Sequence, residues 1–270
     1  MADAERKVAR EAGECKMAEI KLLNQTENEV VFVLDKTTPS FANAVRRAAM
    51  FEVPVLAIED VNFVKNSSAL YDEIIAHRLG LIPLKTDLKS YNLPEECTCK
   101  GKYCAKCSVK ITLKAKGPAV VYAGDMKFKD PSIKPVYAQM PIVKLLENQE
   151  IALEATAVLG KGKVHTKWSP GHAFYRGWPE FKATKDAIKS ALDAIPAEAI
   201  EKSGNEIEVK DFSKWNEAYE HALRKANFTV TNRDDKFIFT LESWGQLKPS
   251  EILTEAVSVL QAKLKDVKLK

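Results

Sequence analysis

The residues best suited to chemistry in this sequence are four cysteines that lie close together. Cys97, Cys99, Cys104 and Cys107 share one short loop with Gly101, whose lack of a side chain lets so compact a segment turn back on itself. Four thiolates satisfy the tetrahedral coordination of Zn²⁺ and leave no open position for water or substrate. The cluster therefore predicts one structural zinc ion rather than a catalytic one. An iron–sulfur centre and four unliganded thiols are the alternatives.

The composition limits where this chain works and what it binds. The 270 residues carry a formal net charge of +4, with acids and bases interleaved, so direct nucleic-acid binding is unsupported. Any nucleic-acid role would come through a complex. No apolar run approaches the roughly 18 residues that span a membrane, and the charged N-terminus is followed by no secretory segment. We therefore expect a cytoplasmic protein, in which a cysteine cluster holds metal more often than disulfides.

Other chemistry-bearing residues show no catalytic pattern. His77, His165, His172 and His221 have no metal-ligand spacing, and no aspartate cluster suggests a two-metal centre. The segment 160–165 is basic and flexible but lacks the spacing of a phosphate-binding loop. We expect no active site in this chain. A free-standing zinc module that binds nucleic acid, and an independent zinc or redox enzyme, remain as alternative functions.

A helix with two different faces precedes the cysteine loop in the chain. Thr37 or Thr38 can cap it, Pro39 suits its first turn, and Pro54 ends it. One stripe at helical spacing is formed by Phe41, Ala44, Val45, Ala48 and Glu52. The opposite side carries Asn43, Arg46, Arg47 and Met50. A methionine among two arginines and an asparagine suits contact with a partner's carboxylates or carbonyls, although an ordinary surface face is the alternative.

The two ends of the chain share one order of elements. Residues 17–24 and 29–35 predict two strands, and 228–231 and 236–241 predict a second pair around a turn at 232–235; a helix follows each pair. Neither pair is expected to be stable alone. We infer that the termini meet to form one split α/β domain, with everything between them inserted.

The last helix has a broad apolar face. A seam with 4-3-4-3 spacing is formed by Leu253, Val257, Leu260, Leu264 and Val267, and it is widened by Ile252, Ala256 and Val259. Such a face predicts contact with a second chain after the helix has covered its own sheet. The alternative is that the helix packs wholly within its own domain.

The inserted region changes in composition and in expected secondary structure along its length. A strand is predicted at 59–65 and a helix at about 69–79, with Gly80 placed to stop it. Residues 108–170 carry alternating or β-branched patterns typical of strands. Residues 181–224, rich in Ala, Lys and Glu, predict two helices around a turn at 203–205.

Four segments together resemble a known family. They are Phe41-Ala-Asn-Ala-Val-Arg-Arg47, Glu52-Val-Pro-Val-Leu-Ala-Ile58, Ile74-Ile-Ala-His-Arg-Leu-Gly-Leu-Ile-Pro-Leu84 and Gly162-Lys-Val-His-Thr-Lys-Trp-Ser-Pro170. With the cysteine loop, they resemble the D-type subunit of archaeal DNA-directed RNA polymerase, the counterpart of bacterial alpha and of the third-largest subunit of eukaryotic RNA polymerase II. The resemblance covers most of the chain from about residue 16.

This resemblance implies an α+β fold in several parts. A split alpha-subunit-like dimerisation domain is expected at 16–58 plus 225–270. The remaining parts are a mobile tail at 1–15, an inserted β-rich domain at 59–170 with the zinc loop at 97–107, and a small ferredoxin-like insertion at 171–224.

The resemblance also implies a scaffold function without catalysis. Family members pair with an alpha-like L-type subunit, are joined by the small N-type and P-type subunits, and form a platform for the two large catalytic subunits of DNA-directed RNA polymerase, which transfer nucleotides. The residues expected to contact the second-largest subunit are Asn43, Arg46, Arg47 and Met50. Those expected to contact the L-type subunit are Leu253, Val257, Leu260 and Leu264.

One departure from the family concerns iron–sulfur clusters. Many archaeal relatives hold clusters in a ferredoxin-like insertion, but here the ligand positions are occupied by Ala191, Ile195, Trp215, Ala218 and His221. Because cluster ligands are usually thiolates, we expect no iron–sulfur cluster and a ferredoxin-like remnant held by apolar packing. A helical pair that only mimics the motif is the alternative.

Overall fold

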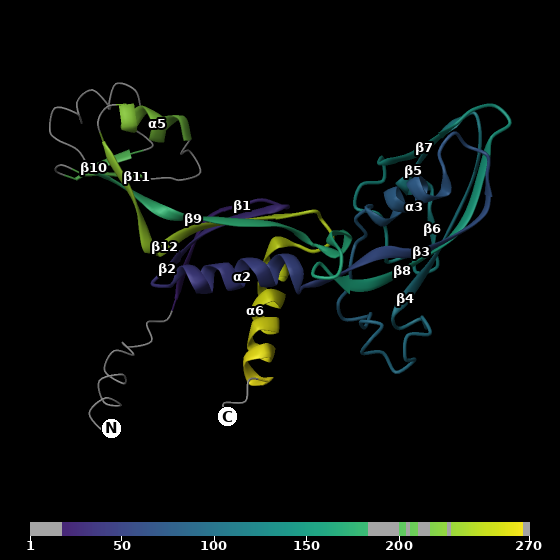
Figure 1. The fold of residues 1–270 in the computed structure, drawn as a ribbon, viewed down its shortest axis with the longest axis horizontal. Helices are drawn as coiled ribbons and strands as arrows, with labels where there is room; N and C mark the ends of the chain where they lie inside the picture. The colour runs from purple at the N-terminus through teal and green to yellow at the C-terminus, as the bar shows by residue number, and fades with distance from the viewer. Residues whose placement is uncertain (1–17, 183–199, 204–205, 210–216, 226–227, 267–270) are drawn as a thin grey trace. The chain divides into compact units, whose positions relative to one another are not determined.

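The computed structural model describes residues 18–182, 200–203, 206–209, 217–225 and 228–266 (Figure 1). Their contacts form two compact units. Unit 1 consists of the described residues of Met1–Arg46 and Phe174–Leu241, and unit 2 of those of Arg47–Ala173 and Glu242–Lys270. The predicted domain boundaries stay a prediction, and the predicted tail at 1–15 lies outside the described residues.

A β-sheet forms the main part of unit 1. Its strands, as far as the described residues go, have the order β1-β2-β12-β9-β11-β10. The first hairpin confirms the prediction from sequence, since β1 (Glu19–Gln25) pairs antiparallel with β2 (Glu29–Asp35). The neighbour of β2 is β12 (Thr229–Ser243), so strands from the two ends of the chain do meet in one sheet.

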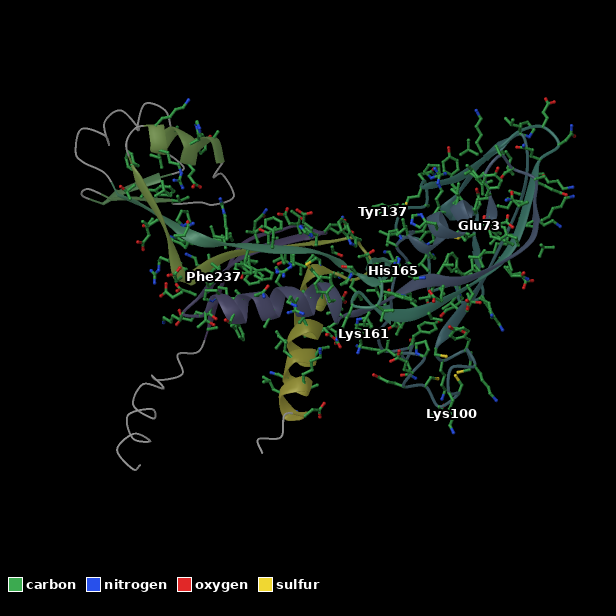
Figure 2. All side chains as sticks on the ribbon, viewed as in Figure 1. Glu73, Lys100, Tyr137, Lys161, His165 and Phe237 are labelled. Carbon is green, nitrogen blue, oxygen red and sulfur yellow. The ribbon has the colours of Figure 1, made fainter. Side chains whose placement is uncertain are left out.

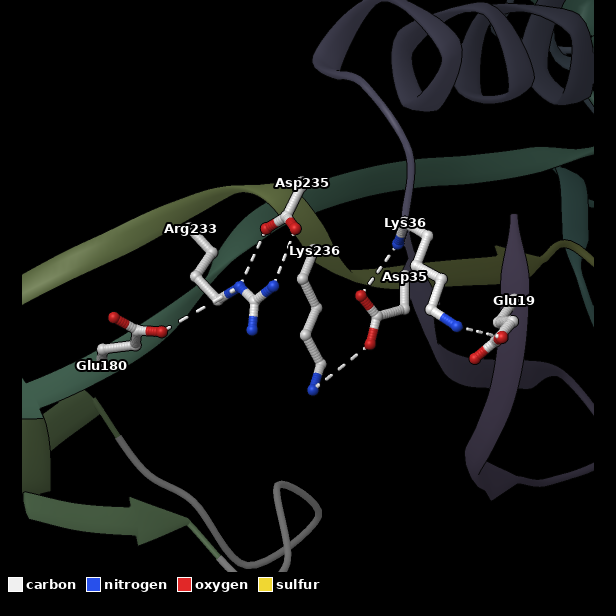
Figure 3. Close-up of polar contacts among 7 residues, drawn as sticks. All are labelled: Glu19, Asp35, Lys36, Glu180, Arg233, Asp235 and Lys236. Carbon is white, nitrogen blue, oxygen red and sulfur yellow. Dashed lines mark hydrogen bonds and ion pairs between the residues drawn. The ribbon is translucent and has the colours of Figure 1, made fainter. Parts of the chain in front are cut away.

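The predicted second strand pair is wrong, because β12 is one continuous strand through residues 232–235. Arg233 donates from Nε and Nη2 to the Asp235 carboxylate at 2.8 and 2.7 Å, and its Nε lies 4.0 Å from Glu180 (Figure 3). Lys236 lies 3.6 Å from Asp35 on β2. Side chains two positions apart share one face of a strand, so the polar run is satisfied by ion pairs in an extended conformation and needs no turn.

Stacked aromatic rings hold the centre of this sheet. The ring of Phe239 lies 5.0 Å from that of Phe32 and 6.2 Å from that of Tyr175, which meets Phe237 edge-on at 5.4 Å. The Tyr175 hydroxyl donates to the carbonyl of Pro39 at 3.3 Å. This bond joins the first residue of α2 (Pro39–Phe51) to the strand that carries Tyr175.

The faces of α2 are rotated from the predicted ones. The backbone N–H of Phe41 donates to Thr38 Oγ1 at 3.3 Å, which confirms Thr38 as the cap. The buried residues are Ala42, Val45, Ala48 and Ala49. Val45 and Ala48 were expected there, but Phe41 is 45% exposed. The helix packs through its small side chains, which permit a close approach, and the bulky Phe41 ring falls at the margin.

The region at 181–224 differs from the two predicted helices. Strand β9 (Gly171–Lys182) is followed by β10 (Ile200–Ser203) and β11 (Glu206–Val209), which pair antiparallel with Ser203 opposite Glu206. Strands rather than helices therefore flank the predicted turn at 203–205, of which residues 204–205 lie outside the described residues. In this short segment the alternation of Ile207 and Val209 with glutamates decides the type of element.

Helix α5 (Glu217–Lys225) completes the described part of this region. It carries Ala218 and His221, two of the predicted lost cluster positions, and both residues are exposed. Ala191, Ile195 and Trp215 lie outside the described residues. The ferredoxin-like remnant therefore stays a prediction.

Unit 2 contains a second sheet with the order β3-β8-β4-β6 and a separate strand pair. The long strands β3 (Pro54–Asn66) and β8 (Glu150–Lys161) pair antiparallel and extend the predicted 59–65 strand toward α2. The remaining elements are β4 (Ser108–Lys116), β5 (Ala119–Tyr122), η1 (Ala123–Asp125), β6 (Lys127–Phe128), β7 (Pro141–Leu145) and η2 (Thr166–Trp168). The largely β character predicted for 108–170 is confirmed.

Helix α3 (Asp72–Gly80) packs against this sheet. Ile75 and Leu79 are fully buried in the same core as Leu56 and Ile58 of β3. The helix starts three residues later than predicted, at two acidic residues that suit a helix N-terminus. Gly80 is its last residue.

Helix α6 (Pro249–Asp266) buries the residues beside the predicted seam. Ile252 and Ala256 are fully buried, whereas Val257 is 43% and Leu264 is 71% exposed. Lys263 forms an ion pair with Glu52 at 2.5 Å. Leu253 and Leu260 are partly buried, and Val267 lies outside the described residues. Within the described part of the chain, no helix is long and apolar enough to cross a membrane.

Candidate metal centre and partner-binding residues

Short backbone turns shape the cysteine loop, which lies between α3 and β4. The N–H of Lys100 donates to the carbonyl of Cys97 at 3.0 Å, and the N–H of Cys107 donates to the carbonyl of Cys104 at 3.0 Å. Gly101 has a φ of +78°, a conformation that glycine adopts without a steric cost, which confirms its expected role in the turn. The loop thus reverses direction twice and turns its cysteines toward one point.

The four sulfur atoms form a compact cluster. The Sγ–Sγ distances are 3.6 Å for Cys97–Cys104, 3.5 Å for Cys99–Cys107 and 3.9 Å for Cys104–Cys107, and all four atoms lie within 4.8 Å of one another. Zn–S bonds of about 2.3 Å place the ligands of a tetrahedral site about 3.8 Å apart. The donor set and its spacing therefore fit a four-thiolate metal ion, and the predicted residues come together.

Local electrostatics prepare the thiols for metal. A hydrogen bond from the backbone of Cys104 lowers the pKa of Cys99 to about 6, which favours the thiolate form that metal ions bind. Burial raises the pKa of Cys107 to about 12. A cation bound among the sulfurs would compensate this burial and displace the proton of Cys107.

Hydrogen bonds join the cysteine loop to the first residue of β4. Ser108, the first residue of β4, donates from its hydroxyl to the carbonyls of Tyr103 and Cys104 at 2.9 and 3.1 Å. Over the described residues, these cysteines are the only cluster of three or more potential metal-ligating side chains.

Two residues of the predicted docking face of α2 are hydrogen-bonded to each other. Arg46 donates from Nε and Nη2 to Asn43 Oδ1 at 3.1 and 2.9 Å. Arg47 is exposed, and Met50 is partly buried. The structure brings these four residues onto adjoining turns, but their role in binding a partner stays a prediction.

A loop that sequence reasoning set aside contacts the end of this helix. The N–H of Lys163 donates to the carbonyl of Phe51 at 3.0 Å, and a Cβ on Gly162 would lie 2.3 Å from the carbonyl oxygen of Met50. Trp168 closes the loop by donating from Nε1 to the carbonyl of Val158 at 3.2 Å. The signal in the sequence that could have found this contact is Gly162, which lies between Lys161 and Lys163 and leaves room for the backbone of α2.

Comparison with known proteins assigns the class. Residues 58–172 match the family described as "RNA polymerase Rpb3/RpoA insert domain". A mixed α/β structure with sheets in both units fits an alpha-like subunit of RNA polymerase.

Similarity over the whole chain narrows this class to one family. The chain is 40% identical over 257 residues to "DNA-directed RNA polymerase subunit Rpo3" of Methanothermobacter thermautotrophicus, covering 92% of this chain and 97% of the relative. Proteins with the same description from Archaeoglobus fulgidus and Pyrococcus furiosus are 34% and 37% identical over 93% and 91% of this chain, and over 97% and 94% of their own lengths. The chain belongs to the Rpo3 family, the D-type subunits of archaeal RNA polymerase, as the motifs indicated.

Proposed function

We propose that this chain is a non-catalytic assembly and scaffold subunit of DNA-directed RNA polymerase in the cytoplasm of an archaeon. It pairs with an L-type subunit, is joined by the small N-type and P-type subunits, and presents a surface to the two large catalytic subunits. It meets nucleic acid only through that complex. Membership in the Rpo3 family supports the polymerase assignment, and apolar side chains left exposed on regular elements support the scaffold function.

The observation that carries the pairing is the exposed part of the α6 seam. Val257 and Leu264 lie two turns apart on one side of the helix and leave 43% and 71% of their surface exposed, while Ile252 and Ala256 complete the internal packing. Apolar residues at this spacing suit a helix from a second chain. Leu253 and Leu260, which are partly buried, extend the same seam.

Strand β1 of unit 1 offers a second apolar surface. Ile20 and Leu22 lie opposite Leu34 and Phe32 of β2, so all four point to one face of the sheet. Leu34 and Phe32 are buried, but Ile20 and Leu22 are 70% and 54% exposed at the edge of the sheet. An apolar edge strand of this kind is a liability in an isolated chain, which supports coverage by a partner subunit.

Native mass tests the pairing. We expect the chain and an L-type subunit to form a one-to-one heterodimer, with one zinc and no iron per chain. Val257→Glu combined with Leu264→Glu is expected to weaken the pairing at least about 100-fold, since it would place two charges in an apolar interface. Ala262→Glu, at an exposed position on another side of α6, is the matched control and should pair normally.

A stable monomer that ignores the L-type subunit would contradict the scaffold assignment and favour a free-standing zinc module. Normal pairing of the Val257→Glu/Leu264→Glu variant would show that α6 is not the interface.

Docking of the second-largest subunit is assigned to α2. Arg46→Glu combined with Arg47→Glu is expected to leave the heterodimer intact while weakening capture of that subunit about 100-fold, because charge reversal opposes the partner's carboxylates or carbonyls. The measurement is equilibrium binding of the purified heterodimer to the second-largest subunit. Equal loss of both contacts would show that the helix face is structural.

A further inference from the structure

We propose that the loop Lys161–His165 and the C-terminal end of α2 form one continuous docking surface, which binds a partner segment carrying carboxylates beside an aliphatic side chain. This inference rests on the proposed docking of the second-largest subunit, whose contact surface it extends from α2 to the loop. The residues of this surface, from Arg47 of α2 onward, lie in unit 2.

The loop and the helix end are fixed together. The Lys163 N–H bonds the carbonyl of Phe51, which lies among the last carbonyls of α2 that have no partner within the helix. Gly162 lies so close to Met50 that a side chain there would overlap the Met50 carbonyl oxygen. A turn from the Val164 N–H to the carbonyl of Lys161, at 2.9 Å, closes the loop. The loop is thus held against the helix end by backbone contacts.

The surface carries uncompensated positive charge. Arg47 and Lys163 are exposed, Lys161 is partly buried, and in the described part of the chain none of the three has a carboxylate partner. In Figure 2, Lys161 and His165 are seen on this loop.

The nearby acids do not supply that compensation. Glu52, directly after α2, pairs with Lys263, and Glu59 on β3 pairs with Lys167. Lys167 is held further by the carbonyl of Ile58 at 3.1 Å and by the ring of Trp168 at 4.4 Å. The surface therefore keeps a net positive charge that complements carboxylates of a partner.

The apolar part of the surface is a single exposed valine. Val164, at the tip of the loop, is 74% exposed between the cationic Lys163 and the imidazole of His165. An exposed aliphatic side chain within a basic patch matches an interface in which an apolar contact is ringed by charges. An acidic protein segment with one aliphatic residue has the complementary chemistry, whereas nucleic acid offers phosphates without such a side chain.

Equilibrium binding of the heterodimer to the second-largest subunit tests the inference. Lys163→Glu is expected to weaken binding about tenfold and Lys163→Gln less than about threefold, because only the glutamate repels the partner's carboxylates. Raising the salt concentration should weaken wild-type binding more than binding of Lys163→Glu. Lys144→Glu, an exposed lysine of β7 in the same unit, is the control and should stay within about twofold of wild type.

The variants separate failure of this inference from failure of the docking proposal. If Arg46→Glu/Arg47→Glu weakens binding but Lys163→Glu does not, α2 docks the subunit without the loop and the inference is wrong. If neither weakens binding, the proposed docking function of α2 is wrong as well. If Lys163→Glu weakens binding no more than Lys144→Glu does, the effect is one of net charge and the inference is overturned.

Discussion

Replacing Cys104 with serine is expected to lower the metal content from about one ion per chain to less than about 0.1 after dialysis against a weak chelator. A hydroxyl is a poor zinc ligand, and three thiolates leave the tetrahedral site open. The sulfur of Cys104 lies 3.6 Å from that of Cys97 and 3.9 Å from that of Cys107, so its loss removes one of the four vertices of the tetrahedral site. Metal analysis by mass spectrometry of the purified protein measures the result.

The same variant should also loosen the loop that the metal holds. Lys100 and Tyr103 have φ values of +52° and +51°, which are unfavourable for residues with side chains and are maintained by the surrounding contacts. Without the metal, we expect faster proteolytic cleavage after the lysines of the loop. Cys15→Ser, which changes a cysteine outside the cluster, is the control for metal content and cleavage. Full metal occupancy in Cys104→Ser would contradict the four-ligand site.

Replacing Phe239 with alanine is expected to lower the free energy of unfolding by about 3–5 kcal/mol. Phe239 is fully buried, and its ring stacks between those of Phe32 and Tyr175, so truncation leaves a cavity at the centre of the unit 1 sheet. Urea denaturation measures the total loss. Hydrogen exchange of peptides from β2, β9 and β12 shows whether the loss falls in unit 1.

Phe41→Ala is the matched control for Phe239→Ala. The same atoms are removed from a ring that is 45% exposed, so we expect a loss below about 1 kcal/mol. Equal losses for the two variants would mean that the aromatic stack does not hold the sheet together.

The elements predicted most accurately are those whose signals are local. The β1–β2 hairpin, the Thr38 cap of α2 and the left-handed Gly101 each depend on residues a few positions apart, which the sequence displays directly. The candidate metal centre belongs to this group as well. Its four ligands lie in one short loop, so no long-range contact is needed to bring them together.

The errors arose where distant residues decide. The polar run at 232–235 has the composition of a turn, but it continues β12 because that strand is held between β2 and β9 and its charges pair along and across the strands. Likewise, the residues of α2 expected on one stripe were chosen from their helical spacing and hydrophobicity, without knowledge of the surface they pack against. In the structure the small side chains Ala42, Ala48 and Ala49 are buried, and Phe41 lies at the exposed edge of the packed face.

The sequence by itself therefore determined the family, the cysteine cluster and the local elements, since each is encoded by neighbouring residues. Only the tertiary structure brought the loop at Lys161–His165 to the end of α2, more than 100 residues earlier in the chain. Only the tertiary structure, too, distinguished the covered residues of α6 from the exposed Val257 and Leu264. A periodic pattern shows which side of a helix is apolar, but which part of that side is covered depends on the shape of elements that are distant in sequence.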